Sequence, residues 1–116
     1  MDTLAAGCNY ATTLTQLGRY NEGKSLLAKV IPVARRVFGE NHEFTLKMRW
    51  NYAEALYGDD GATLDDVRKA VTTLEEIART SQRVLGNLHP ATAGIEHELR
   101  NSRAALRARE TPSRSA

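Results

Sequence analysis

Residues 36–45 read Arg-Val-Phe-Gly-Glu-Asn-His-Glu-Phe-Thr, and residues 83–92 read Arg-Val-Leu-Gly-Asn-Leu-His-Pro-Ala-Thr. The two segments share their arginine, valine, glycine, histidine and threonine positions at an offset of 47 residues. Leu27 and Leu74 match at the same offset, while Asn9 and Asn51, each followed by Tyr-Ala, match at an offset of 42. The extra residues fall in Gly-Asp-Asp-Gly-Ala-Thr-Leu, residues 58–64, a turn-like composition in which added length costs little. The chain therefore contains an internal repeat of 42 residues with one insertion.

The apolar residues within each repeat have the spacing of helices and not of strands. In the first unit they recur at steps of three and four residues, at Leu27, Val30, Ala34 and Val37. We expect five helices, over residues 3–17, 21–38, 43–57, 64–85 and 90–108. Thr63, followed three residues later by an aspartate, is expected to cap the fourth helix. Pro32 removes one backbone donor, which predicts a bend or a short break in the second helix.

The turn between the first two expected helices carries a resemblance to a known family. Residues 17–23, Leu-Gly-Arg-Tyr-Asn-Glu-Gly, resemble the inter-helix turn of a tetratricopeptide repeat, and the 42-residue period resembles the longer repeats of kinesin light chains. The resemblance covers residues 3 to about 108. It implies an all-α fold, a right-handed α-solenoid of two helix–turn–helix repeats followed by a final capping helix. The chain departs from the family pattern at Glu43, where proline is usual, at the insertion, and at Glu98, where the third unit lacks an asparagine.

The same resemblance implies a concave face formed by the first helix of each pair. The partner-binding residues expected on it are Asn9, Thr12, Lys47, Trp50, Asn51, Glu54, His97 and Asn101. Within each helix these positions are three or four residues apart, so each set forms one stripe. Both of the first two stripes are mostly polar, as an exposed groove requires.

Two asparagines and one tryptophan are the most informative members of this set. The amides of Asn9 and Asn51 both donate and accept hydrogen bonds, so they can pair with the backbone of an extended peptide. The competing interpretation is that they are solvent-facing polar residues that only maintain solubility. Trp50 is either an anchor in the groove, since tryptophan is enriched in binding hot spots, or a core residue packed on the neighbouring unit.

Composition and charge exclude several classes of function. The formal net charge of +2 comes from arginines near the C-terminus, and residues 109–116 are expected to form a disordered basic tail beyond a single domain of residues 1–108. That tail has no aromatic residue for base stacking, so no nucleic-acid partner is expected. One cysteine, Cys8, and three separated histidines predict neither a disulfide nor a metal site. No apolar run is long enough to cross a membrane, and the N-terminus lacks a signal peptide, so we expect a cytoplasmic protein.

The sequence thus favours a scaffold for protein–protein interaction that binds a peptide or segment of a partner in a concave groove. The alternative is a structural assembly unit that self-associates weakly through its repeat ends or stacks within a longer array. No nucleophile–base set or phosphate-binding loop is present, so neither an enzyme nor a cofactor is expected.

Overall fold

The structure is a computed structural model that describes residues 3–110, and all regular structure in that range is helical. The five helices are α1 (Thr3–Gln16), α2 (Tyr20–Phe38), α3 (Glu43–Gly58), α4 (Leu64–Val84) and α5 (Pro90–Glu110). Their bounds agree with the expected ones to within two residues. The expected all-α helical-repeat architecture is therefore confirmed.

Two details differ from the sequence-based expectation. α2 continues through Pro32 without the short break, because Pro32 lies on an exposed surface where losing one backbone hydrogen bond is tolerated; the alternative of a bend stays a prediction. α5 extends two residues past 108, because its last turn is held by neighbouring segments. Arg109 donates to the carbonyl of Ala62, and Glu110 accepts from Arg68 at 3.2 Å. The rest of the expected tail, residues 111–116, lies outside the described residues.

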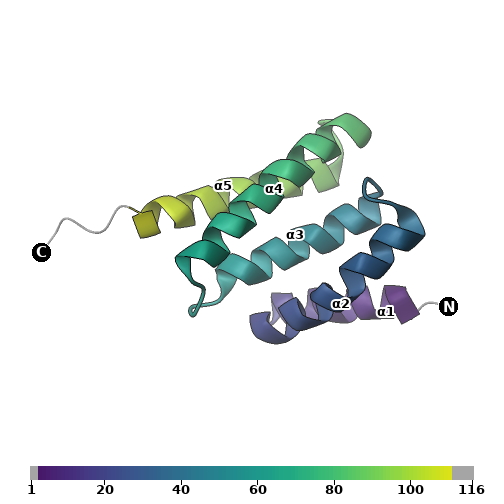
Figure 1. Ribbon diagram of the computed structural model, residues 1–116. Helices are drawn as coiled ribbons and strands as arrows, with labels where there is room; N and C mark the ends of the chain where they lie inside the picture. The colour runs from purple at the N-terminus through teal and green to yellow at the C-terminus, as the bar shows by residue number, and fades with distance from the viewer. Residues whose placement is uncertain (1–2, 111–116) are drawn as a thin grey trace, which may run out of the picture.

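The helices are arranged side by side in chain order (Figure 1). α1 and α2 form one antiparallel pair, α3 and α4 form a second, and α5 packs against α4 and α3. α3 occupies the centre of this arrangement and contacts each of the other four helices. The molecule is consequently elongated, and α3 can share a surface with α1 on one side and with α5 on the other.

The core confirms the repeat register. Leu27 on α2 and Leu74 on α4 are both fully buried, with 0% exposed surface. Leu27 belongs to a cluster formed by α1, α2 and α3, whereas Leu74 belongs to one formed by α3, α4 and α5. Burying a leucine side chain contributes about 2 kcal/mol, so these equivalent positions hold each helix pair together.

The first helix crossing depends on a residue without a side chain. Gly23 of α2 is buried, and a Cβ at this position would lie 2.9 Å from Oγ1 of Thr15 on α1. That separation is too short for a carbon–oxygen contact, so only glycine allows the two helices to approach this closely. Ala70, the equivalent residue of α4, is fully buried as well.

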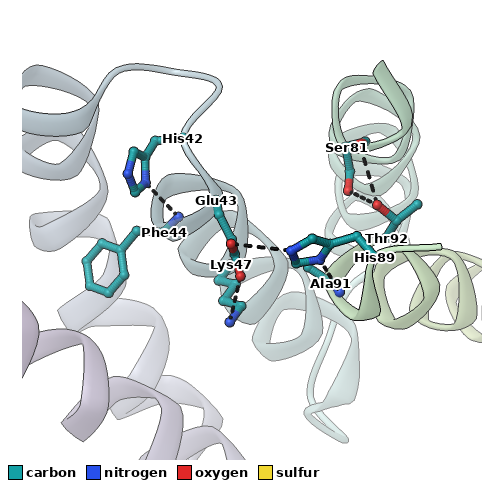
Figure 2. Close-up of polar contacts among 8 residues, drawn as sticks. All are labelled: His42, Glu43, Phe44, Lys47, Ser81, His89, Ala91 and Thr92. Carbon is teal, nitrogen blue, oxygen red and sulfur yellow. Dashed lines mark hydrogen bonds and ion pairs between the residues drawn. The ribbon is translucent and has the colours of Figure 1, made fainter. Parts of the chain in front are cut away.

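Side-chain caps set where three helices begin, and two of the caps occupy equivalent positions of the repeat. His42 accepts a hydrogen bond at Nδ1 from the backbone N–H of Phe44, and His89 accepts one from that of Ala91, both at 3.0 Å (Figure 2). Thr63 caps α4 in a reciprocal capping box with Asp66, as expected. Each of the two histidines therefore acts as a cap, because it satisfies an N–H that the helix itself leaves unpaired.

Candidate functional site

A groove lies between α1 and α3, the first helices of the two pairs. Its volume is about 360 Å³, and it is lined by Asn9, Thr12, Gln16, Phe44, Lys47, Met48, Trp50, Asn51 and Glu54. Six of the eight residues expected to bind a partner are in this set. They come together because the spacing of three and four residues turns one face of each helix toward the same space.

Asn51 and Thr12 join the two walls of the groove. Nδ2 of Asn51 donates to Oγ1 of Thr12 at 2.8 Å, and that hydroxyl donates in turn to the carbonyl of Cys8 at 2.9 Å. The amide nitrogen of Asn51 therefore already donates one hydrogen bond within the protein. Asn9 is exposed, and its amide lies on the surface of the groove.

Trp50 occupies both of the positions that the sequence left open, whereas its role as an anchor for a partner stays a prediction. It borders the groove, and its ring packs against the core cluster of α3, α4 and α5. A Cβ on Gly94 would lie only 2.3 Å from Cη2 of Trp50, so the ring rests directly on the backbone of α5. Its Nε1–H donates to Oε1 of Glu98 at 3.2 Å. The ring is thus fixed by contacts with the neighbouring unit while its edge remains at the groove.

Tyr57 is a residue that sequence reasoning did not assign to the site, and it reaches the site through Glu98. Glu98 also accepts a hydrogen bond from the hydroxyl of Tyr57. Burial, and then the bond to Glu98 and its charge, raise the pKa of Tyr57 far above its ordinary value, so this hydroxyl remains a donor. Glu98 itself occupies the place of Asn9 and Asn51 in the third unit, the departure from the family pattern that the sequence shows.

The charged residues of the groove have different surroundings. Burial, followed by the charge of Glu98, raises the pKa of Glu54 to about 6. Lys47 is exposed and pairs with Oε2 of Glu43 at 3.2 Å, and this contact lowers the pKa of Glu43. Oε1 of Glu43 lies 3.5 Å from Nε2 of His89, so one carboxylate links the starts of α3 and α5 (Figure 2).

The two remaining predicted residues lie apart from this groove. His97 and Asn101 are exposed on α5, and neither lines the space between α1 and α3. Their predicted contact with a partner therefore requires a ligand that extends past Trp50 onto α5.

Within the described residues, the one cysteine is buried and the candidate metal ligands do not cluster. Cys8 is 1% exposed, and burial raises its pKa to about 11, so the thiol stays protonated at neutral pH. Among residues 3–110, no group of three or more His, Cys, Asp and Glu side chains is placed to hold a metal ion. None of the helices in that range is long and apolar enough to span a bilayer.

Comparison with known proteins adds one finding. A family model described as a tetratricopeptide repeat matches residues 2–63, more than half of the chain. The match includes both walls of the groove, and it is consistent with the resemblance to the long repeats of kinesin light chains. Neither the curated proteins nor the solved structures yield a match to the chain.

Proposed function

Because the chain belongs to the tetratricopeptide repeat family, we propose that its groove between α1 and α3 binds an extended or helical segment of a partner protein. Tetratricopeptide repeats generally mediate protein–protein interaction. The observation that supports this site is that six residues on two helices, selected by repeat spacing, line a single space of about 360 Å³. The role is that of a scaffold, without catalysis or a cofactor.

The lining of the groove suits a peptide backbone. The exposed amide of Asn9 offers both a donor and an acceptor, and Asn51 places a second amide across the groove. Phe44 adds apolar surface, and the fixed ring of Trp50 supplies a rigid contact that loses little conformational entropy on binding. Amides bind the backbone of a partner, while the apolar side chains discriminate among its side chains.

The test uses random peptides displayed on phage and selected against the full chain. Affinities of the selected peptides are then measured for wild type, for Asn9→Ala/Asn51→Ala, and for the control Asn87→Ala, an exposed residue outside the groove. The double variant is expected to lose roughly 1 to 3 kcal/mol of binding energy, about fivefold to 150-fold in affinity. Urea denaturation must show that it remains folded, since losing the Asn51–Thr12 bond costs about 1 kcal/mol of stability. Unchanged affinity in the folded double variant would place binding elsewhere.

A second candidate, weak self-association, rests on the N-terminal helix pair. Tyr10 is 57% exposed and Leu17 is 65% exposed. Tyr10 lies beside a hollow of about 420 Å³ that is also lined by Leu14 and Leu26. Exposed apolar surface of this kind can stack against a further helix pair. Analytical ultracentrifugation tests the idea, and a strict monomer at high micromolar concentration would remove it.

A further inference from the structure

The groove contains one charge that residues 3–110 neutralise, that of Lys47, and one that they do not, that of Glu54. Lys47 pairs with Glu43, so its positive charge is compensated on the same helix. Glu54 forms no hydrogen bond or ion pair with any side chain of residues 3–110. The charged residue that acts on Glu54 is another carboxylate, Glu98 of α5. Within the described chain, the uncompensated charge of the groove is therefore negative.

Glu98 does not relieve this imbalance. Its two oxygens accept hydrogen bonds from Nε1 of Trp50 and from the hydroxyl of Tyr57, both of which are neutral donors. The residues of α1 that line the groove, Asn9, Thr12 and Gln16, carry no charge. Glu98 thus contacts the indole of Trp50, and its charge also acts on Glu54, which lies one turn after Trp50 on α3. No cation pairs with either carboxylate among the side chains of residues 3–110.

The repeat offers an internal comparison for this pair. Thr12 and Glu54 occupy equivalent positions at the 42-residue offset, and Asn51 and Glu98 do so at the 47-residue offset. At the interface of α1 and α3, Thr12 and Asn51 are joined by a hydrogen bond of 2.8 Å. At the interface of α3 and α5, the equivalent residues are Glu54 and Glu98, two carboxylates that repel each other. A contact that is complete at one helix interface is therefore incomplete at the next, and a donor with positive charge would complete it.

We propose that the partner segment inserts a lysine or arginine side chain between Glu54 and Glu98, beside the ring of Trp50. This inference rests on the proposed function of the groove. An ammonium or guanidinium group would donate to both carboxylates and would lie against an aromatic ring that attracts cations. Two carboxylates supply too few oxygens for a dedicated divalent-cation site, so a basic side chain fits better than a metal ion. Glu54 lines the same space as Asn9 and Asn51, so a peptide bound by the amides reaches it.

The pH dependence of binding follows from the same contacts. Since burial and Glu98 raise the pKa of Glu54 to about 6, its carboxyl is charged at neutral pH and becomes protonated in mild acid. A cationic ligand prefers the charged form, so affinity should fall as the pH drops through about 6. Added salt should weaken the same interaction, because the site is open to solvent.

The experiment is a double-mutant cycle on peptides selected by phage display against the full chain. Each peptide with a lysine or arginine is compared with its glutamine version, and each is titrated against wild type, Glu54→Gln and the control Glu22→Gln. Glu54→Gln removes a charge without removing a hydrogen bond in the described chain. Glu22 lies on α2, pairs with Arg19 and does not line the groove.

We expect the selected peptides to share a basic residue. Replacing that residue with glutamine should lower the affinity about tenfold for wild type and for Glu22→Gln, but less than about threefold for Glu54→Gln. This inference would be overturned, with the groove still a binding site, by peptides that bind Asn9→Ala/Asn51→Ala more weakly but contain no basic residue. Peptides whose affinity is unchanged by Glu54→Gln would overturn it in the same way. Failure to select any peptide that responds to the asparagine variants would overturn both.

Discussion

Replacing Gly94 with alanine tests the contact that places Trp50 between the groove and α5. An alanine Cβ would lie 2.3 Å from Cη2 and 2.9 Å from Cζ2 of the indole, separations that non-bonded carbon atoms of different residues essentially never show. The ring must therefore move, and it cannot do so freely because it packs on the core and donates to Glu98. The substitution thus acts on packing and on a hydrogen bond at once.

The size of the effect follows from three contributions. Overpacking a close contact costs about 1 to 3 kcal/mol, and losing the bond from Nε1 to a charged carboxylate adds about 1.5 kcal/mol. Alanine in place of glycine raises the free energy of unfolding by about 1 kcal/mol, because glycine is a poor helix former. Gly94→Ala is therefore expected to reduce the free energy of unfolding by about 2 kcal/mol. Gly7→Ala in α1 is the matched control: its Cβ would meet Cγ2 of Val30 at an ordinary 3.4 Å, so it should stabilise by about 0.5 to 1 kcal/mol.

Urea denaturation measures both variants, with Trp50 as the single tryptophan reporter and circular dichroism as a second probe. Native Gly94→Ala should also show a changed emission maximum, since the ring moves relative to Glu98. The reasoning is refuted if Gly94→Ala stabilises the fold as Gly7→Ala does. Trp50→Phe should partly rescue Gly94→Ala, because the smaller ring leaves room for the added methyl group, and circular dichroism would follow that pair.

Three further predictions concern the core, a carboxyl group and a thiol. Leu27→Ala and Leu74→Ala should each lower the free energy of unfolding by about 2 to 5 kcal/mol in urea, and losses below about half a kilocalorie at both sites would contradict the repeat register. The pKa of Glu54 is raised to about 6 from an ordinary 4.5, so its contribution to stability is fully present below pH 4.5 and is lost as the pH rises through 6. Glu54→Gln should therefore be more stable than wild type near neutral pH by about 1 kcal/mol, after allowing for its partial exposure, with no such gain near pH 4. The Cys8 thiol should react with a disulfide reagent near pH 8 only as fast as the protein unfolds, and rapid labelling of the native protein would show that it is accessible.

Much of the fold could be predicted because its signals are local. Apolar residues at steps of three and four define a helix whatever it packs against, and a cap such as Thr63 acts within one turn. The repeat added a second source of information, since a match at a constant offset placed Leu27 and Leu74 in equivalent sites before any contact was known. The bounds of the helices and the stripes of the groove follow from these two patterns.

The charge and anchoring of the site depend on contacts between helices. Lys47 and Glu54 have opposite charges on one stripe, so the sequence favoured neither an acidic nor a basic partner. The balance shifts only because Lys47 meets Glu43, whereas Glu54 faces Glu98 across the interface of α3 and α5.

Trp50 illustrates the same limit. Its packing against Gly94 and its hydrogen bond to Glu98 join residues more than 40 positions apart in the sequence, and no local spacing specifies such contacts. Periodicity determines which face of a helix is turned inward, but the crossing of two helices determines which side chains on those faces come within bonding distance.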